Sequence, residues 1–408
     1  NIEFTTKHEL VVTGTFTANS KAYDGTATAT INTNNLTLDG VVSELGDVSI
    51  GTVTLAFENN EVAAGKTVNI TSIELAGSDA HRYFVDLSSA PTSSANITAK
   101  QLTIGGDFTV ADKEYDGTTA TTIMGNNLTL TTPVVGDDIS LINVEAVFAS
   151  QNAGEDITVS ITAAQLDGAD KGSYSLSLAG TPTSQASITA KELTVTAENK
   201  AVTYGDAVPA LTYTISGFVD GEDETEVSGE ASLSTTYTVS TPVATSPVVI
   251  TAALGTLEAT NYSFAFVDGE ISIDKRELTI GGNFVVTDKE YDGTTSATVA
   301  ESNLTLITPV AEDDVFLTNV VAEFESADAG VDVTVNITAA ELDGVDKENY
   351  SLSLAGLPSS SANITAKELT IGGDFTVAHK EYDGTTAATI TENNLTLVIA
   401  FAGDDVSL

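Results

Sequence analysis

Lys113-Glu-Tyr-Asp-Gly-Thr118 is a phrase that the chain repeats, and its recurrence sets the architecture. The other copies are Lys21-Ala-Tyr-Asp-Gly-Thr26, Lys289-Glu-Tyr-Asp-Gly-Thr294 and Lys380-Glu-Tyr-Asp-Gly-Thr385. Residues 101–191 can be laid on residues 277–367 without a gap, which gives a unit of about 90 residues. A unit of that length can contain its own core, unlike a solenoid repeat that depends on its neighbours. We therefore predict a tandem array of separate modules.

The residue pattern inside each unit predicts β-strands. Short runs rich in Thr, Val and Ile alternate with period two, as in Asp156-Ile-Thr-Val-Ser-Ile-Thr162 and Tyr174-Ser-Leu-Ser-Leu178. Turn signals such as Asp116-Gly117 and Asp167-Gly168 separate these runs. We expect an all-β fold, with about seven strands per unit arranged as a β-sandwich or a related compact β-fold.

The connections between units are too short for free movement. Ser187-Ile-Thr-Ala-Lys-Glu-Leu-Thr-Val195 leads the last strand of one unit almost directly into the first strand of the next. Because no Gly, Ser or Pro spacer intervenes, we predict that the modules form an extended, semi-rigid rod.

One unit differs from the others. It replaces the Tyr-Asp-Gly phrase with Val202-Thr-Tyr-Gly-Asp206, and it contains the acidic stretch Gly217-Phe-Val-Asp-Gly-Glu-Asp-Glu-Thr-Glu226. A short helix in that stretch would make this unit grasp-like rather than a pure sandwich. We predict the end of a preceding module at 1–7, then module 1 (8–100), module 2 (101–191), the divergent module 3 (192–276), module 4 (277–367) and the start of module 5 (368–408), with both ends of the chain cutting through a module.

Composition excludes several functional classes. Acidic residues outnumber basic ones by 58 to 15, and the formal charge is -43, so the surface repels nucleic-acid phosphates and anionic lipids. We predict no nucleic-acid binding. No apolar run is long enough to span a bilayer, so no membrane insertion is expected in this segment. The chain has no Cys, which excludes disulfides and thiolate chemistry.

The repeated phrases carry a family resemblance. The Lys-Glu-Tyr-Asp-Gly-Thr units resemble YDG-type repeats, and the Val202-Thr-Tyr-Gly-Asp206 unit resembles MBG-type modules, which are β-grasp relatives. Modules of these two types alternate in very large bacterial cell-surface adhesins. The resemblance implies a stalk segment of such an adhesin.

Catalysis is not expected, and no catalytic or cofactor-binding residue is predicted. The three histidines, His8, His81 and His379, occupy non-equivalent positions in their units, where sister units have other residues. A histidine base would have to exist in one unit and be absent from its close relatives. We interpret the histidines as surface substitutions.

The Tyr-Asp-Gly phrase has a structural and a binding interpretation. Gly accepts positive φ in a tight turn, Asp can hydrogen-bond its own backbone, and the preceding Tyr can pack inward and fix a corner with its hydroxyl. Alternatively, Tyr115, Asp116 and their counterparts would face a sugar or a peptide. We favour the structural interpretation.

Calcium is the cofactor worth testing, although we predict no specific metal ligands. Gly136-Asp-Asp138 and its counterparts offer paired loop carboxylates, as a hard cation requires. Asp167-Gly-Ala-Asp170 matches Asp343-Gly-Val-Asp346, but no run fits an EF-hand or a nonapeptide calcium repeat. Module 1 departs from the pattern with Leu45-Gly-Asp47 and Ala76-Gly-Ser-Asp79. The acids considered in the other modules are Gly136-Asp-Asp138, Glu312-Asp-Asp314 and Gly403-Asp-Asp405.

The leading hypothesis is a structural stalk of an extracellular bacterial adhesin that holds an adhesive tip away from the cell, in cell adhesion, gliding motility or biofilm formation. Its partners would be other adhesin chains or surface-anchoring proteins. The alternative is that the modules themselves bind glycans or neighbouring chains and assemble into a filament or matrix. Equivalent exposed aromatic residues on every unit would favour binding, and their burial would favour the stalk.

Overall fold

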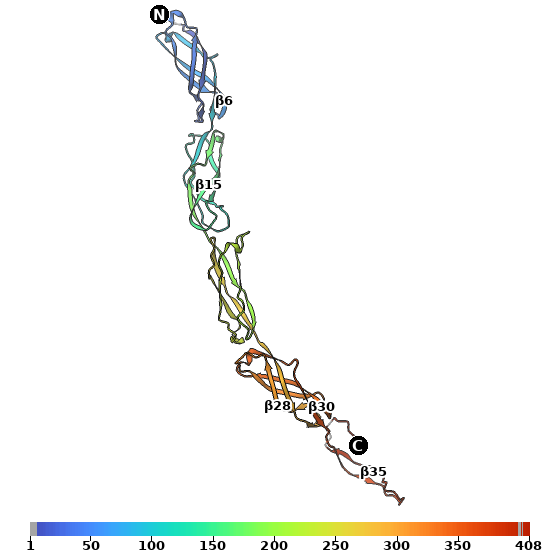
Figure 1. Ribbon diagram of the computed structural model, residues 1–408. Helices are drawn as coiled ribbons and strands as arrows, with labels where there is room; N and C mark the ends of the chain where they lie inside the picture. Colours follow the sequence, from blue (N-terminus) through green and yellow to red (C-terminus); the bar gives the residue numbers. More distant parts are fainter. Residues whose placement is uncertain (1–5, 399–400, 402) are drawn as a thin grey trace. The chain divides into compact units, whose positions relative to one another are not determined.

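The computed structural model describes residues 6–398, 401 and 403–408 (Figure 1). Its regular elements in that part of the chain are β-strands and short 3-10 helices, which confirms the predicted all-β class. The chain divides into two compact units, each described here by itself. Unit 1 comprises 1–193, 217–227 and 258–263, and unit 2 comprises 194–216, 228–257 and 264–408.

Module 1 consists of two sheets that share one core. A five-stranded sheet has the order β2-β8-β6-β5-β3, and a three-stranded sheet has the order β4-β1-β7. Val12 and Phe16 from β1 are buried with Phe57 from β5 and Ile97 from β8, so both sheets contribute to the core. The strands are β1 (His8–Ala18), β2 (Lys21–Ala22), β3 (Thr28–Ala29), β4 (Ile31–Asp39), β5 (Ser49–Phe57), β6 (Ala63–Ala76), β7 (Tyr83–Asp86) and β8 (Ser93–Thr98), with 3-10 helices η1 (Ser43–Leu45) and η2 (Ala80–Arg82).

Module 2 repeats this plan with shorter strands. Its main sheet has the order β11-β17-β15-β14, and two smaller sheets have the orders β13-β9-β16 and β10-β12. The predicted strands at 156–162 and 174–178 correspond to β15 and β16. The elements are β9 (Lys100–Gly105), β10 (Phe108–Val110), β11 (Lys113–Glu114), β12 (Ile123–Asn126), β13 (Thr129–Leu130), β14 (Ser140–Phe148), β15 (Gly154–Asp167), η3 (Lys171–Ser173), β16 (Tyr174–Ser177) and β17 (Thr183–Thr189).

Module 4 reproduces module 1 almost strand for strand. Its sheets have the orders β26-β32-β30-β29-β27 and β28-β25-β31. Its core is formed around Phe284, Phe324, Val335 and Ile364. The elements are β25 (Arg276–Val286), β26 (Lys289–Glu290), β27 (Ser296–Ala297), β28 (Val299–Ile307), β29 (Phe316–Phe324), β30 (Gly330–Asp343), η6 (Lys347–Asn349), β31 (Tyr350–Ser353) and β32 (Ser359–Thr365).

Module 3 contains a four-stranded sheet of order β19-β24-β22-β21. The short helix expected in its acidic stretch is a single 3-10 turn, η4, which Asp223 caps by accepting a hydrogen bond from the Thr225 amide. The elements are β18 (Lys191–Ala197), β19 (Lys200–Thr203), β20 (Tyr213–Ser216), η4 (Glu224–Glu226), β21 (Ser232–Thr235), η5 (Val243–Thr245), β22 (Val248–Ala253), β23 (Tyr262–Val267) and β24 (Gly269–Asp274).

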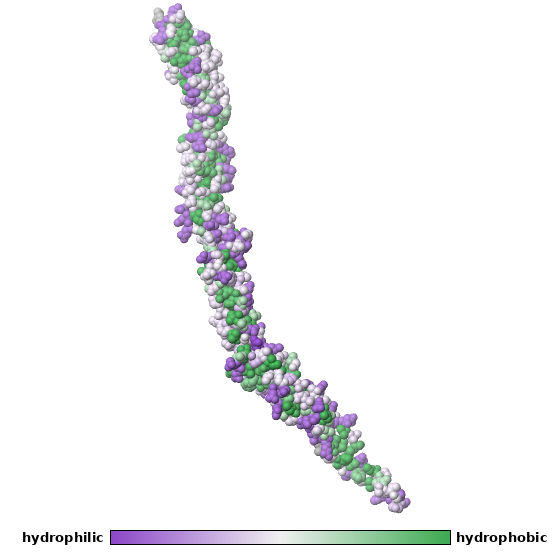
Figure 2. Space-filling view, in the orientation of Figure 1, coloured by the Kyte–Doolittle hydropathy of each residue, from purple (hydrophilic) through white to green (hydrophobic). Residues whose placement is uncertain are grey.

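The described part of module 5 contains two hairpin-like pairs, β33 with β36 and β34 with β35. Large hydrophobic side chains remain exposed there, including Ile371, Phe375 and Val377. Over the face of the molecule seen in Figure 2, hydrophobic and hydrophilic residues are interspersed. The strands are β33 (Thr370–Gly372), β34 (Phe375–Val377), β35 (Ile390–Asn393) and β36 (Thr396–Val398).

The short connections predicted between modules are present. One residue separates β8 from β9, β17 from β18, and β24 from β25: Ala99, Ala190 and Lys275. The first strand of a module also pairs in parallel with the strand that starts at a recurrent tyrosine, as Lys100 opposite Tyr174 and Arg276 opposite Tyr350 show. The place where two modules meet is therefore fixed close to that tyrosine.

Candidate functional site

The repeated phrase folds into one compact turn. In module 2 the Asp116 carboxylate accepts hydrogen bonds from the Thr118 amide (2.9 Å), the Thr118 hydroxyl (2.8 Å) and the Lys113 ammonium (2.7 Å). Gly117 adopts φ 74°, which a residue with a Cβ rarely takes. The Lys113 Nζ atom also lies 5.6 Å from the centre of the Phe148 ring, in a cation–π contact. Lys, Asp, Gly and Thr thus build the turn itself.

The acidity of the turn aspartate reflects these bonds. In module 4 the hydrogen bond from Lys289, together with those from Thr294, lowers the pKa of Asp292 to about 2. The carboxylate stays ionised at neutral pH and keeps its lysine and threonine partners.

The tyrosine of the phrase points out of its own module. The Tyr115 amide donates to the Thr189 carbonyl (2.9 Å) at the end of β17, which fixes the tyrosine beside the linker. Its ring is 2 % exposed and packs edge-to-face on Tyr262 of module 3, with 5.5 Å between ring centres and 79° between planes. Its hydroxyl donates to Glu222 Oε1 at 2.6 Å. All these residues belong to unit 1.

This arrangement corrects one prediction. The Asp-Gly turn forms as expected, but the tyrosine does not fix a corner of its own module, because its ring and hydroxyl contact the next module. The repeated sequence indicates that the tyrosine follows a strand and precedes a turn. It contains no information about which surface of another module covers the tyrosine ring.

The same three-part arrangement occurs at each complete junction, and we call it the clasp. A clasp consists of a turn tyrosine from one module, a strand tyrosine from the next module and an acid of that next module, the shared acid, that accepts a hydrogen bond from the strand tyrosine. At the second and third junctions the turn tyrosine donates to the same carboxylate. The three clasps are Tyr23, Tyr174 and Asp137; Tyr115, Tyr262 and Glu222; and Tyr204, Tyr350 and Asp313.

The strand tyrosine is itself anchored within its module. The Tyr174 hydroxyl donates to Asp137 Oδ2 at 2.6 Å and accepts the Val134 amide proton at 2.9 Å. The Tyr350 hydroxyl does the same with Asp313 (2.6 Å) and the Val310 amide (2.9 Å). The receiving face is thus organised by its own module's contacts.

Burial and the shared carboxylate raise the pKa of the tyrosine hydroxyls in the clasp. The hydrogen bond to Glu222, followed by burial, raises the pKa of Tyr115 to about 12. Burial, followed by the hydrogen bond to Asp313, raises the pKa of Tyr204 to about 12. These hydroxyls therefore remain protonated donors throughout the physiological range.

An asparagine next to the strand tyrosine adds a second contact between modules. Asn261, which is buried, accepts the Ala153 amide proton of module 2 at 3.0 Å. Asn349, also buried, accepts the Val243 amide proton of module 3 at 3.0 Å. The Asn-Tyr dipeptide common to 261–262 and 349–350 was visible in the sequence, but its role across a junction was not predicted.

Ion pairs across the linker complete the junctions. Lys191, the first residue of β18, bonds to Glu114 beside the turn tyrosine of module 2, at 3.0 Å. After module 3 an arginine takes the equivalent place. Arg276 donates from Nε to the Tyr204 carbonyl and from a terminal nitrogen to Asp206, both at 2.7 Å.

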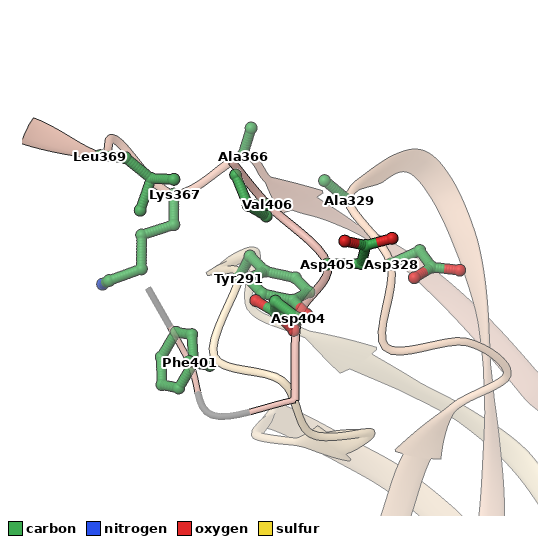
Figure 3. A pocket seen from close by; sticks show the side chains of 10 residues that line it. All are labelled: Tyr291, Asp328, Ala329, Ala366, Lys367, Leu369, Phe401, Asp404, Asp405 and Val406. Atoms are coloured by element: carbon green, nitrogen blue, oxygen red, sulfur yellow. Dashed lines mark hydrogen bonds between the residues drawn. The ribbon is translucent and has the colours of Figure 1, made fainter. Parts of the chain in front are cut away.

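Module 5 carries a partial clasp. The Tyr291 hydroxyl donates to Asp404 Oδ1 at 2.7 Å, and Phe401 packs edge-to-face on the Tyr291 ring at 5.8 Å. Figure 3 shows these side chains lining a pocket of about 370 Å³ together with Lys367. In the complete clasps a strand tyrosine contacts the turn tyrosine. The turn tyrosine of module 5 itself, Tyr382, is 98 % exposed.

Module 1 has a different receiving face. Asp47 and Asp138 hold equivalent places, because their amides donate to Asp79 and Asp170 respectively. Gly46 therefore stands where module 2 has the shared acid Asp137. The Tyr83 hydroxyl donates instead to the Leu45 carbonyl at 2.9 Å.

The loop acids considered as calcium ligands are used in hydrogen bonds. Asp170 accepts the Asp138 amide proton at 2.7 Å, and Asp138 accepts the Ala169 amide proton at 3.0 Å, so the two loops bind each other. Asp314 and Asp346 repeat this exchange in module 4. Over residues 6–398, 401 and 403–408, no group of three or more His, Cys, Asp or Glu residues is placed to hold a metal ion. Calcium binding remains an untested hypothesis.

The histidines lie on the surface. His8 packs against the Tyr83 ring at 5.8 Å, and His81 Nδ1 lies 3.0 Å from the Ser78 carbonyl oxygen. His379 is exposed in module 5. That the chain is not an enzyme remains a prediction.

In the described part of the chain no helix is long and apolar enough to cross a membrane.

Comparison with known families identifies both module types. The YDG domain matches residues 5–93, 98–186 and 274–359, which together are more than half of the chain. The MBG domain (YGX type) matches residues 193–272. A search of the curated proteins found no match.

Two solved structures with some likeness are a titin segment and a cadherin segment. A titin segment of three immunoglobulin domains, in an E-to-A mutated variant, is 11% identical, with 64% of this chain and 96% of that chain covered and a TM-score of 0.22. Drosophila N-cadherin EC1-4 is 10% identical, with 79% and 92% covered and a TM-score of 0.20. Likenesses this weak support no inference about fold or function.

Proposed function

Because the chain belongs to the YDG-domain family, we propose that it is a stalk segment of a large bacterial cell-surface adhesin. In this proposal its work is mechanical: it holds an adhesive tip away from the cell and withstands tension. The membership itself, with a module of the MBG type between YDG modules, is the first support. The extracellular location and any role in gliding or biofilm formation belong to the same proposal.

The observation that carries the proposal is the recurrence of the clasp at successive junctions. A one-residue linker alone leaves two backbone dihedrals free to rotate. The clasp adds two buried rings and two hydrogen bonds to one carboxylate, and an ion pair lies across the linker after modules 2 and 3. Such junctions resist swivelling between the modules they join, as a semi-rigid rod requires.

The distribution of aromatic residues favours the stalk over direct binding. The turn tyrosines of the three complete clasps, Tyr23, Tyr115 and Tyr204, are buried. Exposed aromatics do occur, but at non-equivalent places: Phe84 stands where module 2 has Ser175, and Phe316 where it has Ser140. A binding role would call for the same exposed residues on every module.

Single-molecule pulling of the full chain tests the mechanical role. Each module that yields should lengthen the chain by somewhat less than roughly 300 Å, because an extended residue spans about 3.3–3.6 Å and the length of the folded module is subtracted. A stalk predicts repeated steps of this size at forces well above the noise. Smooth extension without such steps would contradict a load-bearing function.

Surface placement needs a separate experiment. Antibodies raised against the chain should label intact cells of the source bacterium, and external protease should remove the label. Labelling that appears only after the cells are broken would overturn the proposed location.

A third experiment tests direct binding. Beads coated with the chain should not adhere to cells or to arrayed glycans. Adhesion would support the alternative that the modules themselves bind.

A further inference from the structure

We infer that the clasp is a common interface, so that any module with a turn tyrosine fits any module that presents a strand tyrosine and a shared acid, whichever of the two families each belongs to. In particular, an MBG module should accept the turn tyrosine of another MBG module, a pairing that this chain does not contain. The inference rests on the geometry of the junctions and stands whether or not the chain serves as a stalk.

Three of the four possible pairings occur in the chain, with the same geometry. YDG meets YDG at Tyr23 and Tyr174, YDG meets MBG at Tyr115 and Tyr262, and MBG meets YDG at Tyr204 and Tyr350. The ring centres are 5.5 Å apart in all three, and the interplanar angles are 79°, 79° and 82°. The clasp geometry is therefore independent of the module type on either side.

The two module types reach this geometry with different acids. The YDG modules supply an aspartate, Asp137 or Asp313, whereas the MBG module supplies Glu222 from its acidic stretch. In both cases a valine amide donates to the strand tyrosine: Val219 to Tyr262 at 3.0 Å in the MBG module, and Val310 to Tyr350 at 2.9 Å in module 4. What recurs is the placement of donors and acceptors, not the loop sequence.

The MBG module carries both halves of the interface. Its receiving half consists of Tyr262, Glu222 and Asn261, all in unit 1. Its projecting half, in unit 2, consists of Tyr204, whose amide is fixed to the Asp274 carbonyl at 2.9 Å, and the loop amide of Val243. Joined to a second copy, Tyr204 would meet Tyr262 and Glu222, and the Val243 amide would meet Asn261.

The shared acid is the determinant that a partner must supply. A buried phenol that loses its acceptor is left with an unsatisfied donor, which is costly. Module 1, with Gly46 in the place of the acid, is the natural example of a face without this acceptor. A turn tyrosine should therefore be retained by a receiving face with Asp or Glu and released by one with Gly.

The test is a chain in which a second copy of residues 192–276 is inserted between Arg276 and Glu277. Arg276 then follows both copies and keeps its contacts with Tyr204 and Asp206. Phenol acetylation by N-acetylimidazole, located by mass spectrometry after proteolysis, measures the exposure of each tyrosine in the folded chain. Tyr382 is the reactive standard, and Tyr115 is the protected standard that reports correct folding of the first copy.

If the interface is common, Tyr204 in both copies reacts at least about tenfold more slowly than Tyr382, because reaction needs local opening. If the two MBG copies do not fit, about half of the Tyr204 reacts as fast as Tyr382 while Tyr115 stays protected, and the inference is overturned. Protection lost at Tyr115 as well would mean that the insertion disrupts folding. In that case the substitution Glu222→Gly is made in the chain without the insertion. If the acid is the determinant, Tyr115 of that variant should become reactive toward N-acetylimidazole.

A matched substitution isolates the acid. In the chain with the insertion, Glu222→Gly in the second copy alone should expose the Tyr204 of the first copy, whereas Glu224→Gly, at an exposed position two residues away, should not. Equal protection in the two variants would refute the role assigned to the carboxylate, even if the modules fit together.

Discussion

Tyr115 and Tyr382 occupy equivalent turns in modules 2 and 5, but their side chains differ in exposure to solvent. Lys113 and Lys380 bond to their aspartates at 2.7 and 2.8 Å, and Gly117 and Gly384 adopt φ 74° and 72°. Yet Tyr115 is 2 % exposed and Tyr382 is 98 % exposed. The turn is thus a product of local hydrogen bonds, whereas burial of its tyrosine needs contacts from outside the turn, which for Tyr115 include Tyr262 and Glu222 of the next module.

The comparison separates two kinds of stability. The local contacts hold the turn in shape whether or not a neighbour is present. The clasp contributes only when two modules meet, so it links the stability of one module to that of the next. Substitutions made in pairs, one at a clasped position and one at its unclasped equivalent, measure the second contribution directly.

The largest contrast should come from removing the ring. Tyr115→Ala leaves a cavity between modules 2 and 3 and an acid without its donor, and removal of a buried aromatic ring typically costs about 3–5 kcal/mol. Tyr382→Ala should change the free energy of unfolding by less than about 0.5 kcal/mol, as is usual for exposed positions. Denaturant unfolding of the full chain, with hydrogen exchange at residues 113–148 and 217–263, would measure both.

Equal effects of the two alanine substitutions on the free energy of unfolding would contradict the expected difference between the two tyrosines. That result would mean that Tyr115 stabilises only its own turn, and that the contact with Tyr262 contributes nothing. A change of exchange confined to module 2 would have the same meaning, because a clasp must affect both of the modules that it joins.

A smaller effect is expected from the shared acid. Glu222→Gln keeps the shape of the side chain but removes the charge that accepts two phenol hydrogen bonds. Hydrogen bonds to charged groups contribute about 1.5–3 kcal/mol each in favourable cases, and we expect a total loss of about 1–3 kcal/mol because the amide oxygen still accepts one. Glu224→Gln, in the 3-10 turn that follows Glu222, is the control. A loss no greater than that of the control would show that the carboxylate is dispensable.

The sequence was sufficient to predict the modules and their β-structure, because these depend on local patterns. Period-two alternation located β15 and β16, and the Ser187–Val195 run predicted a connection without a spacer, which is the single residue Ala190 in the structure. The repeated Asp-Gly predicted the turn because both residues act on their own backbone. All of these are short-range effects, which a single sequence displays directly.

The clasp could not be predicted in the same way, because it joins residues about 40 and about 110 positions apart in the chain. Glu222 is half-buried in a stretch whose other acids are exposed, and nothing in the local sequence distinguishes it from those acids. The hydrogen bonds of the paired loop acids could not be predicted for a related reason. Asp138 and Asp170 each accept a backbone amide proton from the other's loop, far away in the sequence. Only the recurrence of Asn-Tyr at 261–262 and 349–350 offered a signal.

Alkaline pH should remove the difference between a clasped tyrosine and a phenylalanine in its place. The pKa of Tyr115 is raised from 10.0 to about 12 in the folded chain. Its stabilising contribution is therefore complete below pH 10 and is lost as the pH rises from about 10 to about 12. Tyr115→Phe, which has no phenol proton, should be less stable than the natural chain at pH 8, and the gap should shrink across that window. A gap that stays constant up to pH 12 would contradict the raised pKa.

The smallest contrast concerns the ion pair at the edge of the clasp. Glu114 bonds to Lys191 across the junction at 3.0 Å, while Glu381, its equivalent in module 5, is exposed and has no ion pair among the described residues. Both members of the pair are partly exposed, so Glu114→Gln should cost less than about 1 kcal/mol. Salt should abolish that cost, because about 1 M salt shortens the screening length to about 3 Å. Glu381→Gln should have no measurable effect at any salt concentration. If Glu114→Gln instead matched Glu222→Gln in size and resisted salt, the ion pair, rather than the shared carboxylate, would be the main polar link between modules 2 and 3.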